Sequence, residues 1–145
     1  MEVSLALRTA YFQALNGNVK IKNTPVPVYD AYAIPEQPQY PYILLSSQTE
    51  RQKGIKRCKA YEVTLLVDIV TGSTDPIGRQ LSEEIAWQVE QLIYPDADTD
   101  LDLSSNGYEI GHTMREQSFD QASRNDVYYI FRKLIRYRHS VSPKK

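Results

Sequence analysis

Alternation of apolar and polar residues is clearest between residues 60 and 70, where it predicts a β-strand. Every second position from 61 to 69 is apolar or aromatic, namely Tyr61, Val63, Leu65, Val67 and Ile69. Because successive strand side chains point to opposite faces, this set should face a core, while the positions between form a mixed face. A further strand is predicted over residues 42–48, an apolar run entered from Pro41.

Two other segments have the periodicity of amphipathic helices. Within residues 4–16 one side carries Leu7, Tyr11, Ala14 and Leu15, and Gly17 follows as a C-terminal stop. A longer helix is predicted to start at Pro76 with Asp75 as its cap, and Pro95 prevents its continuation. Its apolar positions recur at intervals of four and three: Ile77, Leu81, Ile85, Val89 and Leu92. We expect this helix to lie on a sheet.

The remaining segments predict strands and their connections. Residues 18–41 hold five of the eight prolines, so any strand there should be short or at a sheet edge. Residues 108–119 and 126–140 are rich in aromatic and β-branched residues and predict two closing strands. Between the strands at 42–48 and 60–70, residues 49–59 should form the tip of an antiparallel hairpin, with Gly54 allowing the reversal.

Length and composition limit the class of protein. The 145 residues suit a single domain, 1–145, and 41% hydrophobic with 24% charged residues is typical of a globular chain. No apolar run approaches the length of about 20 residues that a membrane span needs, and the first residues lack the order of a signal peptide. These features predict a protein made and kept in the cytoplasm, without contact with a membrane.

Catalytic and metal-binding patterns are weak. The one cysteine, Cys58, could pair with His112 or His139, but no glycine-flanked nucleophile turn surrounds it. A calcium-loop spacing is matched by six oxygen-bearing residues: Asp98, Asp100, Asp102, Ser104, Asn106 and Glu109. Leu103 occupies the sixth position, where such loops need glycine, so a solvated acidic loop is favoured. We expect no enzyme, no cofactor and no metal.

Charge is segregated along a chain whose formal net charge is only -1. A cationic hairpin tip is formed by Arg51, Lys53, Lys56, Arg57 and Lys59, and a basic C-terminal segment by Arg132, Lys133, Arg136 and Arg138. The acidic loop opposes them with Asp96, Asp98, Asp100 and Asp102. Opposite charges on separate projections favour head-to-tail contact between copies or docking between unlike partners, whereas the simplest alternative is solvated loops.

The PYILL strand, the cationic hairpin and the helix DPIGRQLSEEIAWQVEQLI before two closing strands give the chain a resemblance to a known family. From Ser4 to about Arg138 it resembles the tail terminator, or tail-completion, proteins of long-tailed bacteriophages, also called head–tail joining or neck proteins. The resemblance implies an α+β fold: one mixed or antiparallel sheet with two helices packed on one face and a long protruding β-hairpin.

The resemblance also implies a function. Such proteins are virion components that form a hexameric ring on the tail tube, end its polymerisation and present a surface to the head connector. Residues 49–59 resemble the family's hairpin, whose cations would meet acidic groups of an adjacent ring or face the channel through which DNA passes. The acidic loop and the basic C-terminal segment correspond to no feature of the family. Two alternatives remain open: a small nucleic-acid-binding module, or another virion component such as a connector or tube subunit.

Overall fold

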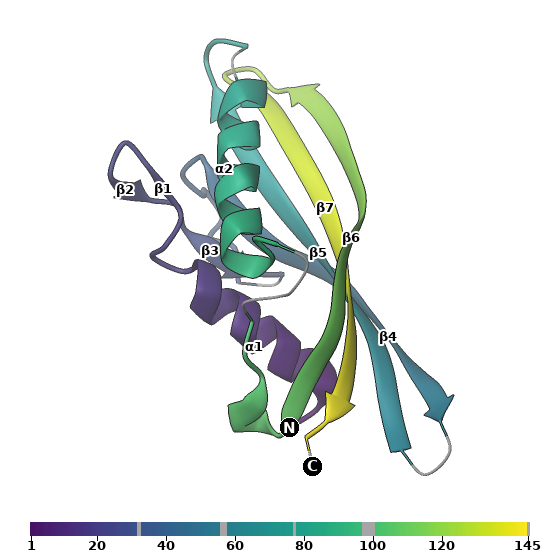
Figure 1. Cartoon of the computed structure of the whole chain (residues 1–145). Coiled ribbons are helices and arrows are strands. Elements are labelled where there is room, and N and C mark those ends of the chain that lie inside the picture. Colours follow the sequence, from purple (N-terminus) through teal and green to yellow (C-terminus); the bar gives the residue numbers. More distant parts are fainter. Residues whose placement is uncertain (32, 56–57, 77, 97–100, 145) are drawn as a thin grey trace.

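The computed structural model describes residues 1–31, 33–55, 58–76, 78–96 and 101–144. Within these ranges, two α-helices pack on one face of a five-stranded sheet, and a small two-stranded hairpin lies beside them (Figure 1). In chain order the elements are α1 (Val3–Leu15), β1 (Lys20–Ile21), β2 (Thr24–Pro25), β3 (Val28–Asp30), β4 (Tyr42–Ile55), β5 (Cys58–Ser73), α2 (Gly78–Ile93), η1 (Ser104–Asn106), β6 (Tyr108–Arg124) and β7 (Tyr129–Pro143). This is the α+β fold that the family resemblance implies.

The large sheet is mixed, with strand order β3, β4, β5, β7, β6. β3 runs parallel to β4, and the other neighbours are antiparallel. The proline-rich segment forms strands of only two or three residues, as its missing amide donors predict, and β3 is an edge strand. At the opposite edge lies β6, so the sheet has one short and one long edge strand.

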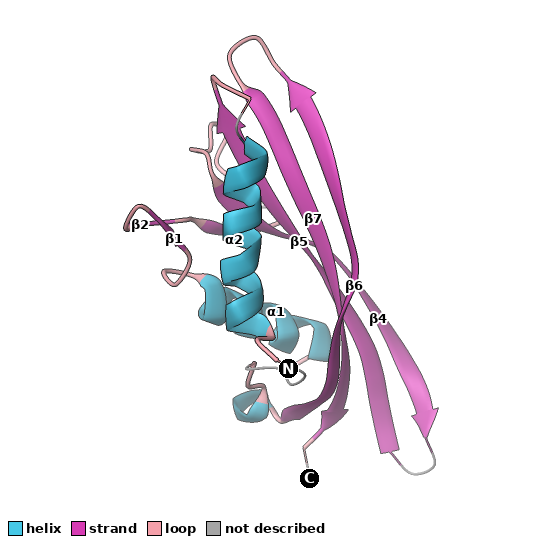
Figure 2. Cartoon of the chain, turned by 45° about the horizontal axis from the view of Figure 1, so that its top comes forward, coloured by secondary structure: helices cyan, strands magenta, loops and turns pink. Residues whose placement is uncertain are grey.

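Both helices cover the same face of the sheet (Figure 2), and the main core lies between these layers. Val63, Leu65, Val67 and Ile69 have no exposed surface, which confirms the predicted alternation in β5. The helices contribute side chains that are equally buried: Leu7, Tyr11 and Leu15 from α1, and Ile85, Val89 and Ile93 from α2. Burying each large aliphatic side chain contributes about 1.5–3 kcal/mol. The amphipathic periodicity of the sequence therefore selects the faces that meet.

The helix boundaries follow the sequence signals closely. α1 is displaced by one residue from the predicted 4–16, and Gly17 follows it with a φ of 80°, a left-handed conformation that glycine adopts without strain. α2 is described from Gly78 onward. The predicted start at Pro76 is wrong, because Pro76 lies in a bend before the helix; Ile77, the residue between Pro76 and Gly78, lies outside the described residues. None of the described helices is long and apolar enough to cross a membrane.

β4 and β5 continue beyond the rest of the sheet as a two-stranded projection (Figure 1). Pairing of β5 with β7 ends at Tyr61 opposite Val141, whereas pairing of β4 with β5 continues to Ile55 opposite Cys58. We call residues 51–55 and 58–61 the β4–β5 ribbon. The strands predicted at 42–48 and 60–70 are thus longer than expected.

The predicted role of Gly54 in the chain reversal is wrong. Gly54 pairs with Lys59 inside the ladder, which continues to Ile55 opposite Cys58, so Gly54 is a strand residue. Cross-strand side-chain contacts sustain the ladder up to this point: the Thr49 and Thr64 hydroxyls are 2.5 Å apart, and Lys53 Nζ lies 2.7 Å from Glu62 Oε1. Each such pair stabilises a sheet by about 0.2–1 kcal/mol. The turn preferences of single residues, such as Gly54, do not indicate which side chains pair across the strands.

Candidate interaction surfaces

The β4–β5 ribbon presents the predicted cationic tip. Arg51, Lys53 and Lys59 are exposed on it, while Lys56 and Arg57 lie outside the described residues. Lys53 is neutralised by Glu62, and this hydrogen bond is the main cause that lowers the pKa of the Glu62 carboxyl. Arg51 and Lys59 form no salt bridge with any described residue. The ribbon therefore carries exposed cations without salt bridges where the sheet projects from the body (Figure 1).

The predicted acidic loop is described only at its two ends. Asp96 and Asp102 are exposed, and Asp98 and Asp100 lie outside the described residues. Asp102 accepts a 2.9 Å hydrogen bond from the Ser104 amide at the start of η1, and its hydrogen bonds with Ser104 lower the pKa of its carboxyl. Among the described residues, no group of three or more acidic, histidine or cysteine side chains is arranged to hold a metal ion.

The basic C-terminal segment lies in β7, and its four cations do not form one surface. Lys133 points to the helix side, where it is nearly buried and contacts Glu83 at 3.0 Å and Asp120 at 3.4 Å. Arg132 and Arg138 point to the other face, because strand side chains alternate. Arg136 also points to that face, and it forms no salt bridge with a described residue.

Carboxylates from neighbouring strands neutralise these two arginines. Arg132 Nη2 lies 2.7 Å from Oδ2 of Asp68, whose side chain is only 3% exposed, and this hydrogen bond is the main cause that raises the pKa of Arg132. Arg138 joins Glu62 at 3.1 Å and Glu116 at 2.6 Å. Most of the cations that the sequence concentrates in β7 therefore form salt bridges within the molecule.

The candidate catalytic pairs of cysteine and histidine are not brought together. His139 is buried opposite Val63, whereas Cys58 lies five residues further along β5, about 17 Å away at the usual rise of a strand. His112 lies in β6, and β7 separates that strand from β5. The His139 ring instead contacts two hydroxyls: Tyr11 Oη at 2.5 Å from Nε2 and Thr113 Oγ1 at 2.9 Å from Nδ1. Burial lowers the pKa of His139 to about 4, so the ring is neutral at pH 7. This group has the character of a satisfied core histidine.

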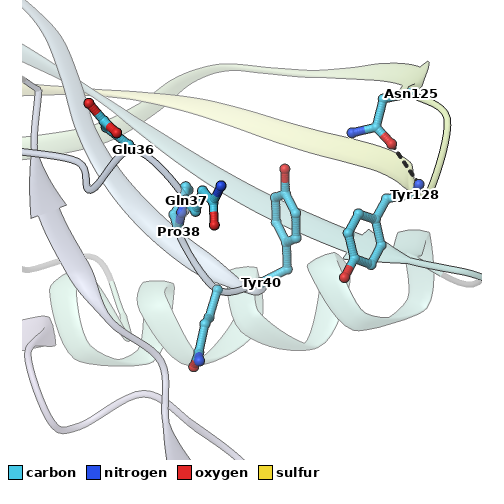
Figure 3. A pocket seen from close by; sticks show the side chains of 8 residues that line it. Glu36, Gln37, Pro38, Tyr40, Asn125 and Tyr128 are labelled. Atoms are coloured by element: carbon cyan, nitrogen blue, oxygen red, sulfur yellow. Dashed lines mark hydrogen bonds between the residues drawn. The ribbon is translucent and has the colours of Figure 1, made fainter.

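A cavity of about 700 Å³ lies where the segment before β4 meets the turn between β6 and β7 (Figure 3). Tyr40 and Tyr128 approach each other edge to face across it, with ring centroids 5.5 Å apart. The Asn125 side chain holds the turn by accepting hydrogen bonds from the amides of Val127 and Tyr128. The described residues of the lining are mostly polar, and one of them, Glu36, is charged. Such a lining offers few groups that converge on one ligand.

Gly72 forms the floor beneath the Tyr40 ring, and its lack of a side chain allows this close approach. A Cβ at position 72 would lie 2.4 Å from the ring. Gly72→Ala is therefore expected to displace Tyr40 from its contacts with Tyr42 and Tyr128, at a cost of about 1–3 kcal/mol. Thermal unfolding and near-UV circular dichroism measure this change. Gly111→Ala is the matched control, because a Cβ there meets nothing closer than 4.0 Å; equal melting temperatures for the two variants would contradict the prediction.

Sequence reasoning missed the exposed apolar residues of the helices. Trp87 is 65% exposed, Leu5 53% and Phe12 40%. The sequence did contain a signal for the exposure of Trp87. The apolar residues at intervals of four and three define the buried side of α2, and Trp87 is not one of them. Large exposed aromatic residues commonly mark contact surfaces.

No family profile matches the chain, and no curated protein matches it. Among solved structures, a chain in the virion of a native gene transfer agent particle is similar with a TM-score of 0.74 and 18% identity, over 97% of both chains. A second solved structure is similar with a TM-score of 0.54 and 14% identity, over 95% of this chain and 96% of the other. At these identities the similarity shows a shared fold, and in both cases it extends over nearly the whole of each chain.

Proposed function

We propose that this protein is a structural protein of a phage-like virion, where it forms a six-membered ring on the head-proximal end of the tail tube. The ring ends tube polymerisation and joins the tail to the head connector. The observation that carries this proposal is the full-length similarity in fold to a chain of a gene transfer agent virion. Since one fold can serve several functions, the proposal also needs support from the surface of this chain.

The surface supports a role in assembly. The β4–β5 ribbon projects from the body with unpaired cations, although an isolated two-stranded ribbon is at best marginally stable in water. A partner that packs on the ribbon would stabilise it. A ring of identical subunits requires two different, complementary surfaces on each copy, and closure at a fixed angle limits growth. Projecting cations fit one half of such a contact, with acidic groups of a neighbouring copy or ring as the other half.

Electron microscopy of the purified protein, alone and mixed with tail tubes, tests the proposal. We expect closed rings at high protein concentration and a ring at one end of each tube, with no change in tube length. Deletion of the gene should yield particles with overlong tails that lack heads. A protein that lengthens tubes would instead be a tube subunit. A monomer that ignores tubes, and whose affinity for DNA falls steeply with salt, would support the nucleic-acid-binding alternative.

A further inference from the structure

One exposed side of α2 has the composition of a contact surface. Gln80, Glu84, Trp87 and Gln91 are all exposed, and their spacing of four, three and four residues places them along one line of the helix. We call these four residues the α2 line. At its centre Trp87 exposes 65% of its surface to solvent, although tryptophan is usually largely buried. An exposed tryptophan on a rigid helix is a typical anchor for a protein contact.

Within α2, the charged residue nearest to Trp87 along the α2 line is the carboxylate of Glu84. Of the four charged residues in α2, three are glutamates and one, Arg79, is cationic. Glu83 contacts Lys133 and Glu90 contacts Arg115, whereas Glu84 forms no salt bridge with a described residue. Glu84 precedes Trp87 by three residues, so its carboxylate lies on the same side of the helix as the indole. A carboxylate beside an aromatic face suits a cation, which gains both an ion pair and a cation–π contact.

The β4–β5 ribbon of the same chain has the complementary chemistry. Arg51 and Lys59 are exposed, and neither forms a salt bridge with a described residue. Figures 1 and 2 show the ribbon extending from the end of the sheet away from α2, so the two surfaces do not meet within one molecule. Two complementary surfaces that face different directions produce a heterologous contact between copies.

We propose that the α2 line receives the β4–β5 ribbon of a second copy. A cation of the ribbon, from Arg51 or Lys59, lies over the Trp87 indole and is neutralised by Glu84. This inference rests on the proposed ring and names the subunit contact that closes it. Each copy then uses its ribbon on one neighbour and its α2 line on the other.

Trp87 is the chain's one tryptophan, so its fluorescence reports directly on the proposed contact. Emission spectra and acrylamide quenching are measured across a concentration series in parallel with sedimentation velocity. We expect a blue shift and at least a twofold fall in the quenching constant as rings form, because the ribbon covers the indole. Rings with unchanged Trp87 fluorescence would overturn the inference and leave the proposed function intact. Absence of rings both in solution and on tail tubes would overturn both.

Charge reversal tests the pairing itself. Glu84→Lys and the double variant Arg51→Glu with Lys59→Glu are each expected to weaken assembly at least tenfold, and their combination to recover most of that loss. Glu109→Lys is the matched control, since Glu109 is also an exposed glutamate but lies in β6. All these variants should keep the far-UV circular dichroism spectrum and melting temperature of the parent monomer. Equal assembly of Glu84→Lys and Glu109→Lys would exclude Glu84 from the contact.

Crosslinking tests the proposed contact between ribbon and α2 line even if copies assemble only on tail tubes. In a Cys58→Ser background, cysteines replace Lys59 and Glu84, and a short bis-maleimide reagent is added to the assembled particles. We expect a ladder of covalent oligomers, with single-cysteine variants giving none above the dimer. Rings on tubes that yield no such ladder would show that the ribbon contacts another surface.

Discussion

Leu65→Asp is expected to abolish folding at neutral pH. Leu65 lies within β5 between the sheet and the helices, and no part of it is exposed. Loss of a buried leucine side chain costs about 2–5 kcal/mol, and an unpaired carboxylate in the core adds several more. The sum is comparable with the whole stability of a typical domain, about 5–15 kcal/mol. Far-UV circular dichroism and denaturant titration would detect the loss.

Leu66→Asp is the matched control for this variant, because it makes the same change one residue along the strand. Leu66 points to the face without helices, where it is opposite Arg136 in the register with β7, and it is 8% exposed. A carboxylate there has a cation and solvent nearby, so the loss of stability should be clearly smaller. Equal destabilisation by the two substitutions would contradict the assignment of Leu65 to the helix-facing side of the sheet.

Acidification is expected to destabilise the protein through His139. Its pKa falls from the ordinary value of 6.5 to about 4 in the folded protein, because the ring is buried. Below pH 6.5 the unfolded chain binds a proton at His139 that the folded chain does not. The free energy of unfolding therefore decreases as the pH is lowered from 6.5 to about 4, and below that pH His139 causes no further decrease. The difference amounts to about 3 kcal/mol. Urea denaturation between pH 7 and pH 4 measures it.

The two histidines of the chain provide a matched pair for this experiment. His139→Gln removes the titrating ring and should flatten the loss of stability between pH 6.5 and pH 5, although it also alters the hydrogen bonds with Tyr11 and Thr113 and lowers stability at pH 7. His112→Gln changes an exposed residue and should leave the pH dependence as it is. If His139→Gln retained the full slope, other groups would be responsible.

Much of the fold could be predicted because local patterns reflect burial directly. The alternation identified Val63, Leu65, Val67 and Ile69 as the side of β5 without exposed surface. The helical periodicity likewise identified core residues, among them Leu7, Ile85 and Val89. Strand lengths could not be predicted. The outer part of the β4–β5 ladder depends on cross-strand pairs such as Lys53 with Glu62, and these become visible only when the register is known.

The candidate interaction surfaces were predicted less completely than the fold. The exposure of Arg51, Lys53 and Lys59 agrees with the expected hairpin tip. The pairing of the β7 cations does not follow from the sequence, because their partners are distant along the chain: 64 residues separate Arg132 from Asp68, and 76 separate Arg138 from Glu62. A run of cations in a sequence therefore does not by itself indicate free positive charge.

By itself, the sequence determined which apolar side chains must leave water, which segments form the two helices, and that charge is unevenly distributed. These properties depend on the period of each element and on residues within a few positions of one another. Only the tertiary structure decided which cations form salt bridges, how far the ribbon extends beyond the rest of the sheet and that Trp87 faces solvent. Those outcomes depend on the register of β4, β5 and β7 and on the side of α2 that packs on the sheet, because ion pairs and exposure are set by neighbours that are remote in sequence.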